Sequence, residues 1–332
     1  MPATISCIIK NSFFTNTKTK INFILRAGDF VFKKFSVFIL ILILTLNMPI
    51  TIKAISEKDY DTQLKQDLLI LMLAYPDHIV NVEKAGDKIF CITKSGKKLL
   101  YDDKKEKNYE EKLANPDLQD MLEQNYPLEK NETLMDKNFD PGRIRHYDLL
   151  NEVYGSSKRE IEKNLTNLKY GYTNYQFNSQ NKANIALETA LKEIIPLAKS
   201  RRDISAILYP ASGTYNYRVI AGTGRLSPHS YGIAIDLKSD KKDYWKWSSR
   251  EQGEKRLSEY PKELVEAFEK NNFIWGGKWN HFDILHFEYR PEIILKARCF
   301  NSWTKNKKWY ENPIYKKDDI KNYIDLIERA VN

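Results

Sequence analysis

Cysteine is scarce in this chain, with 3 residues among 332. Three cysteines are too few for a disulfide framework and cannot form a zinc site made of cysteine alone. Internal repeats and low-complexity tracts are also absent. Because the chain is long and 42% hydrophobic, it can bury one or two cores, which disfavours intrinsic disorder. Cys91 and Cys299 are therefore expected as free, buried thiols rather than as a disulfide.

No apolar run is long enough to span a bilayer. The strongest, 37–44, falls well short of the roughly 20 residues that a membrane-spanning helix needs. A lysine pair at 33–34 precedes it and Ala54 follows, a pattern typical of a secretory signal peptide. We therefore predict a leader over residues 1–54 and an exported protein outside the cytoplasmic membrane. Cleavage after Ala54 is favoured over an uncleaved anchor, which would be the chain's only link to the membrane.

The residues before this pattern form an unusually long extension for a leader. Gly28-Asp29 has codons compatible with a purine-rich ribosome-binding sequence, and Val31 is compatible with a GTG start codon. We hypothesise that translation begins at Val31.

The charge of the whole chain is strongly basic, at +9. Residues 1–54 contribute seven basic residues and one acidic residue, which leaves 46 basic and 43 acidic residues beyond them. The exported part is only mildly basic and has no basic stripe interleaved with aromatics, so nucleic acid is not an expected partner.

After the leader, the sequence predicts a small region of helix and hairpin over residues 55–137. A helix is expected over 61–74, ending near Pro76, because leucine and methionine recur there at helical spacing. Short β-branched and aromatic runs separated by glycine turns predict strands at 79–82, 88–92 and 98–101. A further short helix is expected up to Leu122.

Residues 138–332 mix helices with short strands in no regular alternation. Helices are expected at 149–154, at 181–195 with an end near Pro196, and at 261–271. Short strands and glycine-rich loops fill most of the stretch between 208 and 290. This order predicts an α+β fold with a small central antiparallel sheet and flanking helices, not a doubly wound parallel sheet.

Two motifs in this region supply metal-ligating side chains. The first is His-x-x-Gly-x-Ala-x-Asp, from His229 to Asp236, and the second is Asp-x-x-His-Phe-Glu, from Asp283 to Glu288. Two histidines and a carboxylate are the three protein ligands that a catalytic zinc takes, with a fourth position left for water. Strand alternation places Asp236 on the face opposite the flanking isoleucines, and it places His286 and Glu288 on one face.

In these two motifs the chain resembles the zinc D,D-peptidase family, over roughly residues 140–292. That family contains D-alanyl-D-alanine carboxypeptidases and L-alanyl-D-glutamate endopeptidases, and its fold is the Hedgehog/D,D-peptidase fold. The resemblance implies a Zn²⁺ ion bound by His229, Asp236 and His286. It also implies Asp283 as general base and Arg218 as the residue that stabilises the transition state.

Several residues near the motifs have competing interpretations. Arg225 is an alternative to Arg218, and Glu288 either replaces Asp283 as base or orients a ligand histidine. Ser227 and Trp279 are further candidates for contact with substrate. His281 is expected to face substrate or solvent, because a fourth protein ligand would leave no position for water. The turn 140–143 is expected to shape a loop.

The resemblance implies a peptidase acting on the stem peptides of bacterial peptidoglycan. Carboxypeptidase and endopeptidase specificities share the metal centre, so the motifs do not separate them. The alternative is a non-catalytic, zinc-containing module that binds the cell wall. Loss of the base or of the arginine would indicate such a module, but Asp283 and Arg218 are both present.

Overall fold

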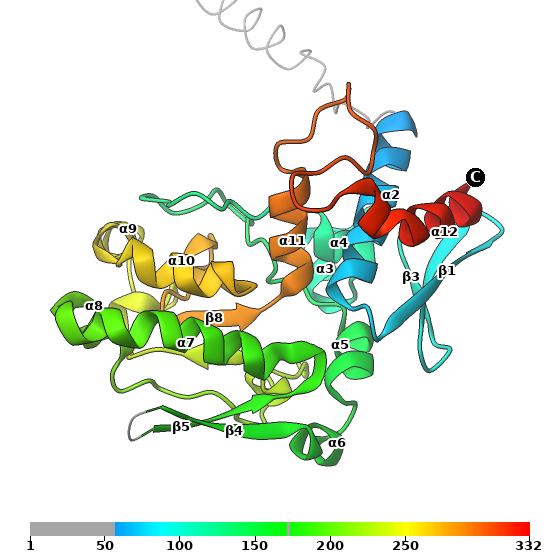
Figure 1. Ribbon diagram of the computed structural model, residues 1–332. Helices are drawn as coiled ribbons and strands as arrows, with labels where there is room; N and C mark the ends of the chain where they lie inside the picture. Colours follow the sequence, from blue (N-terminus) through cyan, green and yellow to red (C-terminus); the bar gives the residue numbers. More distant parts are fainter. Residues whose placement is uncertain (1–56, 171–172) are drawn as a thin grey trace, which may run out of the picture. The chain divides into compact units, whose positions relative to one another are not determined.

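The described part of the protein contains helices and three small antiparallel sheets. The computed structural model describes residues 57–170 and 173–332, so the predicted leader lies outside the described residues. The described residues form one compact unit (Figure 1). This composition confirms the predicted α+β class. No helix among the described residues combines the length and apolarity needed to cross a membrane.

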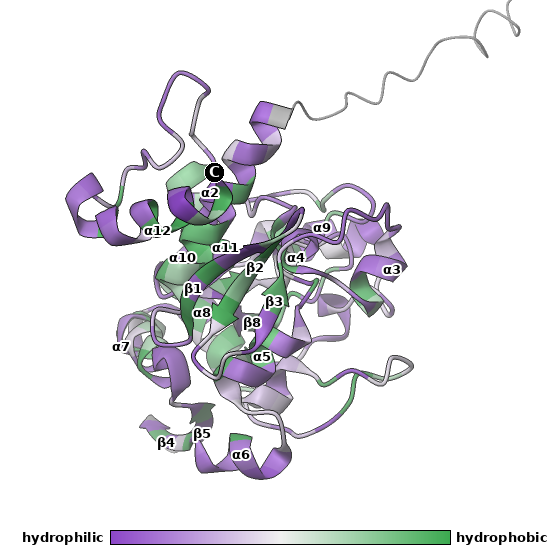
Figure 2. Cartoon of the chain, turned by 90° about the vertical axis from the view of Figure 1, so that its right-hand side faces the viewer, coloured by the Kyte–Doolittle hydropathy of each residue, from purple (hydrophilic) through white to green (hydrophobic). Residues whose placement is uncertain are grey.

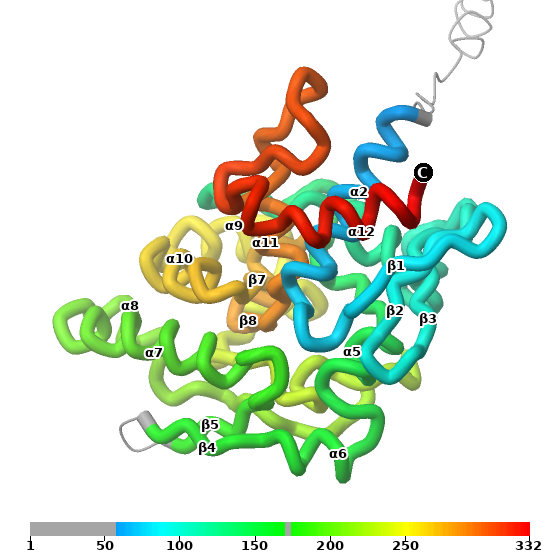
Figure 3. Tube along the Cα trace, turned by 45° about the vertical axis from the view of Figure 1, so that its right-hand side comes forward, coloured from blue at the N-terminus to red at the C-terminus, as the bar shows by residue number. Residues whose placement is uncertain are grey.

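The first described segment is a helix followed by a three-stranded meander. Helix α2, Glu57–Ala74, is followed by strands β1 (Ile79–Ala85), β2 (Lys88–Thr93) and β3 (Lys98–Leu100), which pair in that order. The helix and the strands expected from apolar spacing are therefore confirmed. Helix α12, Lys321–Val331, lies beside α2 and β1, so the C-terminal end of the chain covers its first described elements (Figures 1 and 3).

The remaining helices surround two further sheets. Short helices α3 to α6 lead into the hairpin of β4 (Leu165–Tyr170) and β5 (Thr173–Asn178). Their bounds are Tyr109–Ala114, Leu118–Leu122, Tyr147–Tyr154 and Lys158–Lys163. The later helices α7 to α11 are Ala183–Ser200, Arg202–Leu208, Arg250–Glu259, Lys262–Lys270 and Pro291–Phe300. Single 3-10 turns are η1 (Gln180–Lys182), η2 (Pro228–Tyr231), η3 (Lys241–Asp243), η4 (Gly276–Lys278) and η5 (Lys317–Ile320).

The central sheet has β8 between its two partners. Strand β8, His286–Tyr289, pairs antiparallel with β6 (Ala234–Asp236) on one side and with β7 (Phe273–Trp275) on the other. Phe287 of β8 stacks on Phe268 of α10, with ring centroids 4.2 Å apart. Aromatic packing of this kind anchors the sheet to the helix that covers it.

Helix α7 differs from the prediction at its C-terminal end. The helix does not end near Pro196 but continues to Ser200, with Pro196 inside it. Proline lacks an N–H donor and normally breaks a helix interior. Here Ala198, two residues later in the chain, is buried in the core. Packing of this last turn therefore outweighs the local preference against proline.

One hydrophobic core spans the regions predicted as 55–137 and 138–332. Figure 2 shows hydrophobic stretches gathered in the interior around α2 and the strands, while α6 and α12 are largely hydrophilic. Cys91 and Cys299 are both buried and free, as predicted. Buried polar contacts also join the two regions: the Tyr75 hydroxyl donates to Glu292 at 2.6 Å, and the Tyr126 hydroxyl donates to Glu269 at 2.6 Å.

Helix α5 begins with an unusual cap. The Nδ1 atom of His146 accepts a hydrogen bond from the backbone N–H of Leu149 at 3.2 Å. Burial lowers the pKa of His146 to about 4, because the imidazolium form loses its hydration. Only the unprotonated Nδ1 can accept this bond, so the cap and the burial both favour neutral His146.

We predict that this cap makes folding stability depend on pH. Between about pH 6.5 and pH 4 the unfolded chain binds a proton that folded His146 resists, so stability falls as the pH falls. In urea unfolding, the stability of wild type relative to His146→Asn should fall by about 2 kcal/mol from pH 7 to pH 4.5. Asparagine retains a capping acceptor but does not titrate. A constant difference across this range would contradict the prediction.

Candidate metal site and the surrounding cleft

Antiparallel pairing of β6 with β8 brings two of the predicted ligands together. Asp236 lies directly opposite His286 in this register. His229 comes from η2, which is capped by Ser227; the Ser227 side chain accepts a hydrogen bond from the His229 backbone N–H at 3.3 Å. Gly232 ends η2 in the left-handed conformation at φ 67°, which lets the chain turn at once into β6.

The three side chains present a compact set of donor atoms. His229 Nε2 lies 3.1 Å from Asp236 Oδ1, His286 Nδ1 lies 2.8 Å from the same oxygen, and the two nitrogens are 3.3 Å apart. Burial alone would raise the pKa of Asp236, but the two imidazoles hold it below its ordinary value. Asp236 is therefore a carboxylate, and together with the histidines it forms a candidate metal site.

Each histidine has a partner on its other ring nitrogen. His229 Nδ1 lies 2.6 Å from the backbone carbonyl oxygen of Thr214. His286 Nε2 lies 3.6 Å from Glu288 Oε2. Such outer partners orient ligand histidines and fix which nitrogen is free for the metal.

Glu288 is completely buried and is held by two arginines. Arg145 donates to both of its oxygens, from Nε at 2.8 Å and from Nη2 at 2.5 Å, and Arg290 Nη1 lies 3.5 Å away. Burial would raise the pKa of Glu288, but Arg145 and the other hydrogen-bond partners hold it below its ordinary value. A carboxylate paired in this way supports His286 from behind and is a poor proton acceptor.

Asp283 lies on the loop between η4 and β8, close enough to the candidate metal site to interact with its charges. Its backbone N–H donates to the Gly276 carbonyl at 3.0 Å, and a Cβ at position 276 would clash with the Asp283 carbonyl, so only glycine fits there. Burial raises the pKa of Asp283 to about 6, and the Asp236 carboxylate contributes to the rise, although His286 opposes it. This carboxylate is thus poised to exchange protons near neutral pH.

One cleft contains the three donors together with most of the predicted functional residues. Asp283, Arg218, Ser227 and Trp279 all line it. Trp279 packs against His286, with ring centroids 5.8 Å apart, and donates to the Pro141 carbonyl at 2.9 Å. Glu288 does not line the cleft, because it lies buried on the other side of His286.

The two competing arginines occupy different positions on one loop. Val219 and Leu226 form an isolated antiparallel bridge, so the segment between them turns back as a loop. Arg218 lies at its base, where its backbone N–H donates to Ser230 Oγ at 2.8 Å, and lines the cleft. Arg225 does not line the cleft. The structure thus favours Arg218 as the residue that can reach a bound substrate.

Some cleft and outer residues were not predicted from the sequence. Arg145 is hydrogen-bonded to Glu288 and the Thr214 carbonyl lies beside His229, and no local motif predicts either contact. Arg143, expected only to shape a loop, lines the cleft. His281, expected to face substrate or solvent, also lines it. Trp247, on the same cleft, is 68% exposed.

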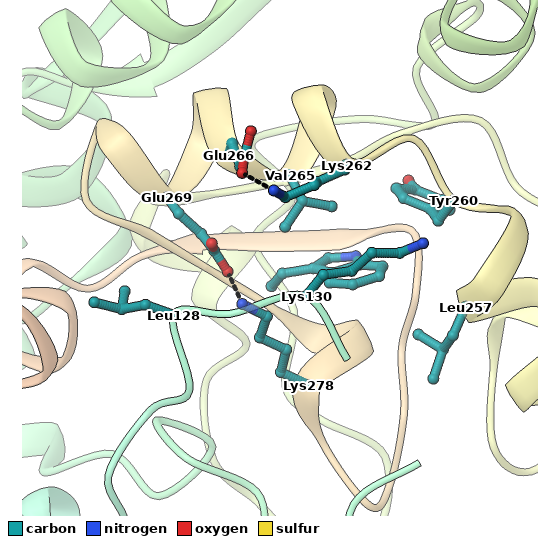
Figure 4. A pocket seen from close by; sticks show the side chains of 10 residues that line it. Leu128, Lys130, Leu257, Tyr260, Lys262, Val265, Glu266, Glu269 and Lys278 are labelled. Carbon is teal, nitrogen blue, oxygen red and sulfur yellow. Dashed lines mark ion pairs between the residues drawn. The ribbon is translucent and has the colours of Figure 1, made fainter. Parts of the chain in front are cut away.

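A second pocket lies apart from these residues and shares none of them. Its lining includes Leu128 and Tyr260 (Figure 4). Trp275 also lines it. Lys278 enters it and pairs with Glu269 at 2.6 Å (Figure 4). Because the Lys278 ammonium also donates to the Pro127 carbonyl at 2.7 Å, its charge is already satisfied. We therefore interpret this pocket as a packing gap between chain segments and not as a binding site.

An α+β fold with a His-Asp-His donor set and a neighbouring carboxylate in one cleft is an arrangement suited to a metal-dependent hydrolase. Residues 221–289 match the family model described as D-alanyl-D-alanine carboxypeptidase. The match supports a peptidase and confirms the predicted relationship to the zinc D,D-peptidase family for this part of the chain. Searches of curated proteins and of solved structures found no match.

We predict that Glu288 depends on Arg145 for its burial. Arg145→Met should destabilise the fold by about 3 to 5 kcal/mol in urea unfolding, because it leaves a buried carboxylate with only its longer contacts. The double variant Arg145→Met/Glu288→Gln should be less destabilised than Arg145→Met alone, since it also removes the unpaired charge. Strictly additive losses in the two single variants would contradict this coupling.

Proposed function

We propose that this chain is an exported zinc metallopeptidase that hydrolyses the stem peptides of bacterial peptidoglycan. The observation that carries the proposal is the position of His229, Asp236, Asp283 and His286 in one cleft and within the matched segment. Arg218 lies on the same cleft, just outside that segment. Export follows from the predicted leader and from the location of such a substrate outside the cytoplasm.

The donor set fits zinc in both chemistry and spacing. Imidazole nitrogens and a carboxylate oxygen are ligands that Zn²⁺ takes in catalytic sites. In a tetrahedron with bonds of about 2.05 Å, neighbouring ligand atoms lie about 3.3 Å apart. The three distances here, 2.8, 3.1 and 3.3 Å, are close to that value. A bound Zn²⁺ would supply a Lewis acid and a water whose pKa is lowered to about 7.

Asp283 is the residue we assign as general base. A carboxylate with a pKa near 6 can accept a proton from the attacking water and return it to the leaving amine. Glu288 is unsuitable for this role, since Arg145 occupies both of its oxygens and it does not line the cleft.

Arg218 is the residue we assign to the negative charge that develops on the substrate carbonyl oxygen. Among the described residues the guanidinium of Arg218 has no hydrogen-bond or ion-pair partner, so its donors are available to substrate. A permanently charged guanidinium that lines the cleft can stabilise such a charge.

Hydrolysis of peptidoglycan fragments by the purified full chain tests the proposal. We expect cleavage in the presence of zinc, loss of cleavage with a chelator, and recovery when zinc is restored. Mass spectrometry of the products identifies the bond: release of terminal D-alanine shows a carboxypeptidase, and cleavage within the stem shows an endopeptidase. Stoichiometric zinc binding without cleavage of either kind would contradict the proposal and favour a non-catalytic wall-binding module.

We predict that Asp283→Asn retains zinc but lowers kcat by about 10²- to 10⁴-fold, because the amide cannot accept the proton. Zinc content is measured by atomic spectroscopy alongside the rate. Asp87→Asn is the matched control, since Asp87 is exposed in the turn between β1 and β2 and should leave the rate unchanged. Full turnover in Asp283→Asn would exclude Asp283 as the base.

A further inference from the structure

Arg143 is a third arginine on the cleft, and its surroundings differ from those of Arg145 and Arg218. Its Nη1 donates to the Tyr109 hydroxyl at 2.6 Å, and the same nitrogen lies 3.7 Å from Asp140 Oδ2. The side chain is 24% exposed and lines the cleft. Arg143 is thus held at one nitrogen while the rest of its guanidinium remains accessible.

Asp140 is the central residue of a cluster that also contains Tyr109, Arg143 and His281. Its side chain has no exposed surface. Its oxygens contact the Tyr109 hydroxyl, the His281 backbone N–H at 2.8 Å and His281 Nδ1 at 2.7 Å. Three short contacts on a buried carboxylate satisfy its charge, so the longer approach of Arg143 leaves the arginine free for another anion.

Aromatic packing keeps the cluster rigid. The rings of Tyr109 and His281 are stacked, with centroids 5.4 Å apart and planes inclined by 11°. The ring of Trp245 also packs edge-on against the His281 ring, with centroids 4.7 Å apart. Because Tyr109 is confined on its ring and on its hydroxyl, the position of Arg143 is set before any ligand binds.

The chemistry of the free donors indicates what they bind. A guanidinium presents paired N–H groups in a planar fork that matches the two oxygens of a carboxylate. Arg145 cannot serve in this way, because both of its forked donors contact Glu288. Arg218 is assigned to the reacting carbonyl. Arg143 is therefore the cleft residue left to recognise a separate anionic group of the ligand.

We propose that Arg143 is a specificity residue that binds a carboxylate of the stem peptide, and that Tyr109 and Asp140 are its positioning residues. This inference rests on the proposed function. Stem peptides offer such a carboxylate from two sources: the α-carboxylate of the D-glutamate residue and the C-terminal carboxylate of D-alanine. The shared chemistry is an anion at a fixed distance from the bond that is cut.

Two matched pairs of peptides distinguish these sources. One pair differs only in having a D-glutamate α-carboxylate or α-carboxamide, and the other in having a terminal D-alanine acid or amide. For one pair, wild type should prefer the acid by about tenfold or more in kcat/KM, the effect expected of a charge-assisted hydrogen bond. Arg143→Gln should reduce that preference to within about twofold by slowing the acid alone.

Further variants separate recognition from folding. Arg143→Lys keeps the charge but loses the fork, so it should retain part of the preference. Tyr109→Phe keeps the ring stacked on His281 but removes the hydroxyl that holds Arg143, so it should weaken the preference for the acid. Arg202→Gln, an exposed change of the same charge, is the control. An equal loss on acid and amide in every Arg143 variant, or an undiminished preference, would overturn the proposal.

Calorimetric binding keeps this test independent of catalysis. The same peptide pairs are titrated into zinc-loaded Asp283→Asn, with and without Arg143→Gln. If wild type cleaves no peptide, the proposed function fails. Tighter binding of the acid that disappears with Arg143→Gln would still establish the carboxylate site. Equal binding of acid and amide with Arg143 intact would overturn it.

Discussion

The pairing of β6 with β8 is the constraint on which the candidate metal site depends. It places Asp236 opposite His286, and Ala234 and Glu288, two residues along each strand, form the next pair on the same face. A shift of register by one residue would send Asp236 and His286 to opposite faces of the sheet. Packing of Ile235 and Phe287 in the core on the other face opposes such a shift, because the same slip would move them to the face that holds the polar side chains. The hydrophobic core therefore specifies the metal ligands.

Charge burial behind the sheet adds a second constraint. Glu288, Arg290 and Glu292 are all fully buried, and an isolated ion in such a place would be very costly. They are tolerated because each charge has a partner of opposite sign. Arg145 pairs with Glu288, and Arg290 pairs with Glu292. The second oxygen of Glu292 accepts a hydrogen bond from the Tyr75 hydroxyl. The chain of contacts leads from His286 to the end of α2, so the orientation of a ligand depends on packing far from the cleft.

Local patterns predicted the parts of the molecule that local chemistry controls. The residue spacing within 229–236 and within 283–288 predicted the metal-ligating side chains, and the sequence pattern predicted helices α2 and α10. Helix α7 exceeded its predicted end because burial of Ala198 depends on the tertiary fold. Arg145 could not be predicted as the partner of Glu288, since 143 residues separate them and many arginines in the chain have similar local surroundings. Tyr109 could not be predicted as the partner of Arg143 for the same reason.

The segment before residue 138 is structurally continuous with the cleft. Tyr126 donates its hydroxyl proton to Glu269 and accepts the backbone N–H of Trp275, and the Pro127 carbonyl accepts from buried Lys278. Without these partners, the buried Lys278 and Trp275 N–H would lose hydrogen bonds that water could not easily replace, at a cost of about 1 to 3 kcal/mol each. Both residues flank the Gly276-Gly277 turn whose close packing fixes Asp283. The matched segment 221–289 thus contains the donors and the carboxylate, but their geometry also depends on Tyr126 and Pro127, which lie outside that segment.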